Sequence, residues 1–124
     1  MNQKLGKPYK LCSKKLIEQL FDDSNSLNSF PFSSKFILID KKDGPPFQVA
    51  FSVPKKKFKS AVDRNKIKRL MREALRLNKL IIEEKIPTDK QLALFLIYTP
   101  REEFSFDVLN SKMIKLWNKI TTQL

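Results

Sequence analysis

The sequence contains no histidine, one cysteine and two glycines, and these scarcities exclude several kinds of catalytic site. Without histidine, no imidazole is available for acid–base chemistry near neutral pH. Cys12 alone cannot form an internal disulfide, and the usual zinc ligand sets are missing. Gly6 and Gly44 stand alone, so no glycine-rich phosphate-binding loop is encoded. We therefore expect no catalytic residues, no protein-held metal site, and a Cys12 that acts as a small apolar side chain.

Long apolar runs are missing as well. No segment approaches the roughly 18 apolar residues that span a bilayer, and the first 30 residues lack the core of a signal peptide. We expect a cytoplasmic protein that does not bind membranes. A chain of 124 residues with 41% hydrophobic content predicts one domain over 1–124, in which the polar residues 1–10 form a mobile arm.

Acidic residues are scarce relative to basic ones. The chain has 13 Asp and Glu against 25 Lys and Arg, which leaves a net charge of +12. Ten of the basic residues lie between positions 55 and 76, where Asp63 and Glu73 are the only acidic ones, so this segment carries +8. An ordinary solvated helix face mixes both signs. The segment therefore predicts a polyanionic partner, with nucleic acid as the leading candidate.

Hydrophobic periodicity predicts a helix, two or three strands, the basic helix, a strand and a final helix. This order indicates an α+β sandwich with one parallel βαβ unit. Trp117 lies in the apolar stripe of the last helix, so we expect it in the core and not against a base. In order, the expected elements are a helix from Ser13 to about Asp22, a loop over 22–34, strands over 35–40 and 47–53, the basic helix from Ser60 or Asp63 to about Asn78, a buried strand over 91–99 and a helix after Ser105.

The strand over 47–53 alternates between large apolar and small or polar residues. Phe47, Val49, Phe51 and Val53 fall on one face, and Gln48, Ala50 and Ser52 fall on the other. The small residues on the second face either lie beneath a closely packed helix or leave a groove open for a ligand.

The basic helix is predicted to have two faces with different roles. At 100° per residue, the apolar side chains group on one side and dock the helix on the sheet. The planar guanidinium groups of the arginines on the other side suit bidentate contacts with phosphate. RNA is favoured over duplex DNA, because a helix–turn–helix reader needs a preceding helix and a short turn. The apolar face comprises Ile67, Leu70, Met71, Ala74 and Leu77, and the opposite face comprises Asn65, Lys68, Arg69, Arg72 and Arg76.

The run F-S-V-P-K-K followed by A-V-D-R-N-K-I-K-R-L-M-R-E-A resembles the signature of the bacterial ribonuclease P protein component. The resemblance extends over about residues 8–120 and implies an α-β-β-β-α-β-α fold with a left-handed βαβ crossover. It implies an accessory subunit of a ribonucleoprotein endonuclease that removes the 5′ leader from precursor tRNA. The implied partners are ribonuclease P RNA and precursor tRNA, without DNA. Mg²⁺ is then held mainly by the RNA, and the free protein is monomeric and does not cleave alone.

The resemblance also implies two sets of binding residues. Ile17 and Ile39 depart from it, because the family often has aromatic side chains there, and Lys59 replaces a common glycine. The implied contacts with the catalytic RNA are Lys55, Lys56, Arg64, Asn65, Lys68, Arg69 and Arg72, and the implied cleft for the single-stranded leader is lined by Ile17, Phe21, Phe36, Ile39, Ala50 and Ser52.

Two other hypotheses remain open from the sequence. The first is a ribosome-associated protein that binds structured RNA without stimulating cleavage. The second is a self-sufficient nuclease that uses scattered carboxylates. Dependence of activity on the tRNA leader separates the ribosome-associated protein from a ribonuclease P subunit, and metal-dependent cleavage by the isolated chain identifies the nuclease.

Overall fold

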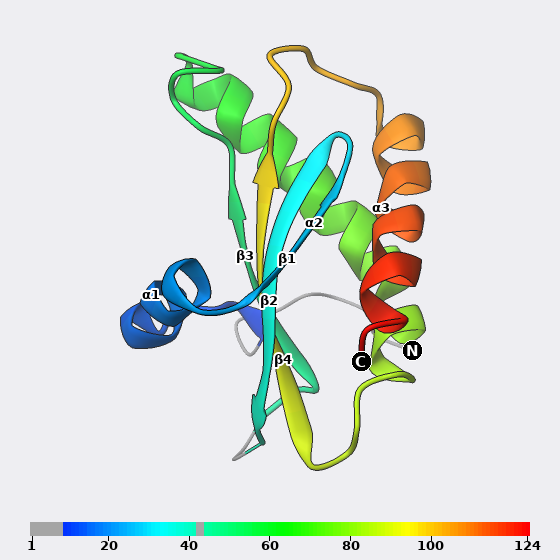
Figure 1. Cartoon of the computed structure of the whole chain (residues 1–124). Coiled ribbons are helices and arrows are strands. Elements are labelled where there is room, and N and C mark those ends of the chain that lie inside the picture. The colour runs from blue at the N-terminus through cyan, green and yellow to red at the C-terminus, as the bar shows by residue number, and fades with distance from the viewer. Residues whose placement is uncertain (1–8, 42–43) are drawn as a thin grey trace.

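A computed structural model describes residues 9–41 and 44–124, in which three helices pack around a four-stranded sheet (Figure 1). The order α-β-β-β-α-β-α confirms the predicted fold class. None of the helices in these residues is long and apolar enough to cross a membrane. The elements are α1 (Lys14–Asp22), β1 (Asn25–Ser29), β2 (Phe32–Asp40), β3 (Phe47–Ser52), α2 (Ala61–Glu83), β4 (Lys90–Tyr98) and α3 (Phe106–Thr121).

Each helix is capped at its N-terminus by a serine. The hydroxyl oxygens of Ser13, Ser60 and Ser105 accept hydrogen bonds from the backbone N–H groups three residues further on, at 3.2, 3.5 and 3.4 Å. Serine is favoured at this position because it satisfies an N–H group that has no partner inside the helix. The predicted starts of the first and last helices are confirmed, and Ser60 is the cap of the basic helix. Cys12, expected as a small apolar side chain, is exposed.

The predicted arm over 1–10 lies mostly outside the described residues. Its last residue, Lys10, forms an isolated parallel bridge with Val49, and the N–H of Leu11 donates to the Val49 carbonyl at 3.0 Å. The chain therefore enters the fold along the free edge of β3.

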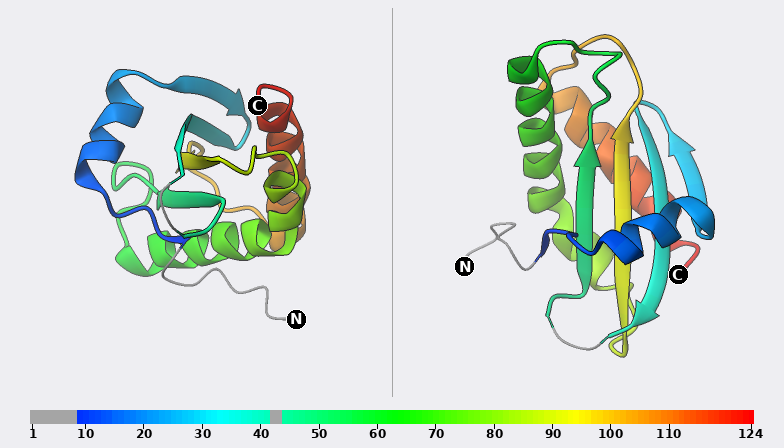
Figure 2. Two further views of the ribbon diagram at one scale, coloured as in Figure 1. Left: turned by 90° about the horizontal axis from the view of Figure 1, so that it is seen from below. Right: turned by 90° about the vertical axis from the view of Figure 1, so that its left-hand side faces the viewer.

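The strand order in the sheet is β1-β2-β4-β3. β2 is antiparallel to both its neighbours, and β3 is parallel to β4, which confirms the predicted βαβ unit. Seen with α1 towards the viewer, β4 lies to the right of β3 and α2 descends to the far side of the sheet (Figure 2, right). The crossover is therefore left-handed, as the family resemblance implied and contrary to the strong right-handed norm.

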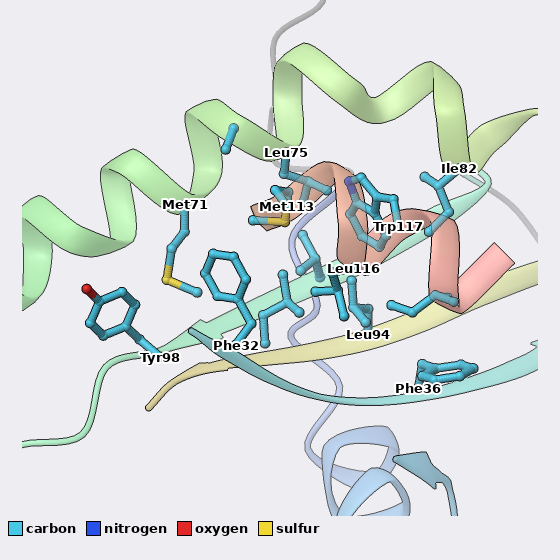
Figure 3. Packing of buried hydrophobic residues seen from close by; sticks show 14 of the residues in the cluster. Phe32, Phe36, Met71, Leu75, Ile82, Leu94, Tyr98, Met113, Leu116 and Trp117 are labelled. Atoms are coloured by element: carbon cyan, nitrogen blue, oxygen red, sulfur yellow. The ribbon is translucent and has the colours of Figure 1, made fainter. Parts of the chain in front are cut away.

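The helices cover the two faces of the sheet unequally. α2 and α3 bury the main core, where Trp117, Tyr98 and Phe32 are almost completely inaccessible (Figure 3). Trp117 is therefore a core residue, as predicted. α1 covers the other face through a smaller cluster around Leu20 and Ala93. Part of that second face extends beyond α1.

The loop expected over 22–34 is wrong over most of its length, because residues 25–29 and 32–34 lie in strands. β1 pairs with the first half of β2, which begins at Phe32 and not at Lys35. The hydroxyl of Ser34 donates to the Leu27 carbonyl at 2.7 Å, and that of Ser33 donates to Asn28 Oδ1 at 2.8 Å. Strand pairing thus overrides the turn preference of Ser and Asn, because these polar groups find partners across the hairpin.

The basic helix is longer than predicted and buries a slightly different stripe. It ends at Glu83 and not near Asn78. Leu77, expected in the docking stripe, is 47% exposed, whereas Leu75 is completely buried. Leu77 lies roughly 100° around the helix from the centre of the buried arc, so its side chain points away from the sheet.

Burial of Tyr98 predicts a loss of stability at high pH. Its hydroxyl donates to the Glu102 carbonyl at 2.6 Å, and burial raises the pKa of Tyr98 from 10.0 to about 12. Because the folded state holds this proton more tightly than the unfolded chain, stability falls as the pH rises from about 10 towards 12. Tyr98→Phe removes this contribution, so urea denaturation should show a shallower decline for the variant in that window. Equal declines for the two proteins would contradict the assignment.

Candidate nucleic-acid interface

The outward face of α2 carries a hollow bordered by cations. Ile67, Met71 and Ala74 fix the helix on the main core, so the opposite side chains project from a rigid support. The hollow has a volume of about 570 Å³ and is lined by Val62, Asn65, Lys66, Lys68, Arg69 and Arg72. Four of these residues belong to the predicted RNA-binding set.

Three cations on this face have no acidic partner. Within 9–41 and 44–124, no carboxylate lies within 4.0 Å of the charged groups of Lys68, Arg69 or Arg72. The Arg72 guanidinium carbon lies 5.7 Å from the centre of the Phe51 ring, which favours a defined orientation. These three side chains are available to an external anion.

Two neighbouring cations are partly neutralised within the fold. Lys66 Nζ lies 3.4 Å from a Glu103 carboxylate oxygen. Arg76 pairs with Glu73, and its hydrogen bonds hold the pKa of that carboxyl below the ordinary value. Both pairs are solvent-exposed and weak, yet they distinguish Lys66 and Arg76 from the three unpaired cations.

Arg64 has a structural role that its position in the motif did not reveal. Its guanidinium donates to the carbonyl oxygens of Phe58 and Lys59, both at 2.9 Å. These bonds fasten the loop after β3 to the first turn of α2. Lys59 accommodates the loop without a left-handed backbone conformation, because no described non-glycine residue has a positive φ.

The lysine pair that precedes the helix is exposed beside it. Lys55 and Lys56 lie in the segment between β3 and α2, where the N–H groups of Lys57 and Phe58 donate to the Pro54 carbonyl at 3.0 and 3.2 Å. This turn places the two exposed lysines in the loop that leads to α2. The hollow thus gathers four of the seven predicted RNA contacts, Lys55 and Lys56 lie in the loop that leads to α2, and the Arg64 side chain is directed into that loop.

The face of the sheet on the α1 side carries an exposed aromatic group. Phe21, on α1, is 50% exposed, and its ring centre lies 5.0 Å from that of Phe95 in an edge-on contact. Lys35 Nζ lies 5.7 Å from the centre of the Phe21 ring. Ala50 is paired with Phe95 across the sheet, and Ser52 follows on the same face. These residues place an aromatic ring, small side chains and a cation together.

Two of the six predicted cleft residues do not belong to this group. Phe36 is 1% exposed in the main core, because strand alternation directs it towards α2 and α3 (Figure 3). Ile39 shares a face with Lys35 but pairs with Gln91, beyond the Ile37–Ala93 pair that α1 covers. The predicted grouping is therefore wrong for Phe36, and Ile39 lies apart from the aromatic ring on the same face. Ile17 packs against the small cluster beneath α1 and is half-buried.

Two residues of the α1 side were missed from the sequence, namely Lys35 and Phe95. Lys35 was taken only as the start of a strand, and the unbroken apolar run of β4 concealed which face Phe95 occupies. The available signal was the alternation in β3, because the strand paired with Ala50 and Ser52 must place Phe95 and Ile97 on the same face. Among the described residues, no three His, Cys, Asp or Glu side chains gather closely enough to hold a metal ion.

Comparison with known proteins assigns the chain to a family. The family model for ribonuclease P matches residues 5–121. The ribonuclease P protein component of Lactobacillus helveticus is 34% identical over 105 residues, which are 85% of this chain and 79% of that protein. The chain belongs to the ribonuclease P protein family. The Chlorobaculum tepidum member is 44% identical over 63 residues, which are 47% of this chain and 41% of that protein.

Solved ribonuclease P proteins share the fold. The Thermotoga maritima protein superposes with a TM-score of 0.70 at 24% identity, over 89% of this chain and 96% of that one. The Staphylococcus aureus protein gives 0.68 at 22% identity, over 90% and 94%. Membership in the family makes the chain an accessory protein subunit of the endoribonuclease ribonuclease P, which acts with ribonuclease P RNA. The family assignment thus favours this function over a ribosome-associated or self-sufficient protein.

Proposed function

We propose that this subunit binds ribonuclease P RNA through α2 and the leader of precursor tRNA through the α1 side of the sheet. The observation that carries the proposal is the row of unpaired cations, Lys68, Arg69 and Arg72, on a helix that the core holds rigidly. By holding both RNAs, the subunit promotes removal of the 5′ leader.

The α2 side suits the backbone of a folded RNA. Like charges three and four residues apart repel one another by a few tenths of a kcal/mol per pair, roughly, until an anion neutralises them. Phosphates provide that neutralisation and release counterions when they bind. Asn65 is exposed beside the cations and offers both a donor and an acceptor, which suits a base edge or a ribose hydroxyl.

The α1 side suits a single strand. Exposed aromatic rings stack on unpaired bases, while nearby cations contact the backbone. Phe21 supplies the ring and Lys35 the cation. Ala50 and Ser52 have short side chains, so the neighbouring surface of the sheet does not rise beside the ring. A mature tRNA lacks this strand, so the surface distinguishes precursor from product.

We assign the catalytic Mg²⁺ to the RNA subunit, where phosphate oxygens supply the hard ligands that the ion prefers. The protein contributes positive charge that reduces repulsion between the two RNAs, so less Mg²⁺ is required for their association. In this proposal the free subunit is a cytoplasmic monomer, it does not bind DNA, and the enzyme forms only with its RNA.

Leader cleavage at low Mg²⁺ tests the proposal directly. Precursor tRNA is incubated with ribonuclease P RNA, with and without the protein, beside a sample of protein alone. We expect strong stimulation by the protein and no cleavage without the RNA. Cleavage by the isolated chain after removal of all copurifying RNA would overturn the accessory role, and a well-folded protein that gives no stimulation with its cognate RNA would do so as well.

Replacement of Phe21 should reduce affinity in a leader-dependent manner. Phe21→Leu keeps an apolar contact with Phe95 but removes the aromatic face. Loss of one base-stacking contact predicts roughly tenfold weaker binding of precursor tRNA to the assembled enzyme. Binding of mature tRNA should be unchanged, and the two dissociation constants are compared by filter binding.

Ile39→Ala is the matched control for that measurement. Ile39 lies on the same face but beyond the pairs that α1 covers, so we expect no leader-specific effect. An equal effect of both substitutions, or an equal loss for mature and precursor tRNA after Phe21→Leu, would remove Phe21 from the leader site.

A further inference from the structure

The tip of the β1–β2 hairpin presents an aromatic ring that the functions proposed above do not use. Phe30 is 60% exposed, more than any other aromatic side chain among the described residues. Its ring centre lies 5.8 Å from that of Phe104 at an interplanar angle of 81°. Phe104 is partly buried and packs against the main core, so Phe30 rests on a supported neighbour.

The hairpin tip and the loop beneath it are firmly joined. The carbonyl oxygen of Pro31 accepts from the backbone N–H of Thr99 at 3.0 Å and from its hydroxyl at 3.1 Å. The buried Tyr98 hydroxyl donates to the Glu102 carbonyl at 2.6 Å and fixes the other end of the loop. A ring held on such a support loses little conformational freedom when it binds a ligand.

The aromatic tip is continuous with the cationic face of α2. Glu103, next to Phe104 in sequence, pairs with Lys66, which lines the hollow together with Lys68 and Arg69. The hairpin tip and the start of α2 lie at the same end of the sheet (Figure 2, right). An RNA strand bound at the start of α2 can therefore extend to Phe30 along this connection.

The chemistry of the tip favours an uncharged planar ligand over a phosphate. Glu102 and Glu103 border the aromatic pair, and only Glu103 is neutralised by a lysine among the described residues. A phosphate is disfavoured beside them, whereas a nucleobase carries no charge and stacks on an aromatic face. We propose that Phe30, supported by Phe104, stacks on one unpaired nucleobase of the RNA that lies along α2. This inference rests on the proposed role of α2 in binding RNA.

Two substitutions of Phe30 separate stacking from simple packing. Phe30→Leu keeps an apolar contact with Phe104 but removes the aromatic face, whereas Phe30→Trp enlarges that face. We expect Phe30→Leu to weaken binding of ribonuclease P RNA roughly tenfold, and Phe30→Trp to bind at least as tightly as the wild type. The slope of log Kd against log salt concentration should stay unchanged in both, because no charge is lost. Leu80→Ala, at a 50% exposed position on the second half of α2, is the control and should bind normally.

The failure of this inference is distinguishable from that of the proposed function. If neutralising Lys68, Arg69 and Arg72 weakens RNA binding but Phe30→Leu does not, Phe30 only packs on Phe104 and the inference is overturned. If neutralising the three cations has no effect, the α2 interface itself is wrong, and the inference falls with it. A lower melting temperature of Phe30→Leu with normal RNA affinity also overturns stacking.

The same measurement identifies which RNA supplies the base. Binding is measured first with ribonuclease P RNA alone and then with precursor tRNA added to the assembled enzyme. A tenfold loss with the RNA subunit alone assigns the base to that RNA. A loss confined to precursor tRNA overturns the inference, because α2 is proposed to bind the RNA subunit, and no loss in either arm overturns it as well.

Discussion

Replacing Lys68, Arg69 and Arg72 together by glutamine should weaken binding of ribonuclease P RNA roughly a hundredfold to a thousandfold near physiological salt. The three side chains have no acidic partner in the described part of the chain, so their positive charge is not neutralised within the fold. Each phosphate contact contributes about 0.7 to 0.9 to the slope of log Kd against log salt concentration. The slope should therefore fall by about two to three, as measured by filter binding over a salt series.

A second triple variant controls for net charge. Lys112, Lys115 and Lys119 lie along one side of α3, and their replacement by glutamine removes the same charge from another surface. Its effect on Kd should be small and should not reproduce the full change in slope. Equal losses from both triples would show that the overall charge, and not the α2 face, determines binding. Glutamine keeps the helical propensity high, so both variants should retain the wild-type circular dichroism spectrum.

Arg64 was left out of that triple because of its surroundings in the structure. In the motif it is equivalent to its basic neighbours, and the sequence therefore grouped it with them. Its two hydrogen bonds to loop carbonyls depend on the path of residues 53–60, which periodicity does not predict. The cationic face itself was predictable, because residues three and four apart on one helix share a side whatever the rest of the fold does.

The α1 side was less predictable because its residues come from different strands. The apolar run over 36–39 has large side chains on both faces, so alternation did not reveal that Phe36 belongs to the main core. Strand register decides which residues are neighbours across a sheet. That register places Ile39 beside Gln91 and Lys35 beside Phe95, and β2 begins within the polar segment that the sequence indicated to be a loop.

Trp117→Ala should lower the free energy of unfolding by about 3–5 kcal/mol. The side chain is completely buried, and its ring centre lies 6.5 Å from that of Phe47 in the core between α3 and the sheet. Domains of this kind have about 5–15 kcal/mol of stability in total, so the substitution removes a large share of it. Urea denaturation monitored by circular dichroism measures the shift of the midpoint.

Trp117→Phe tests whether the indole acts only through packing in the core. Trp117 Nε1 has no hydrogen-bond partner among the described residues, so phenylalanine removes volume without breaking a bond there. We expect a loss smaller than that of the alanine variant, with the affinity for RNA unchanged under conditions where both proteins are folded. An RNA-affinity defect in a fully stable Trp117→Phe would place the indole at a binding surface. Phe30→Ala supplies the opposite pattern, because an exposed ring contributes little to stability and, in our proposal, much to RNA binding.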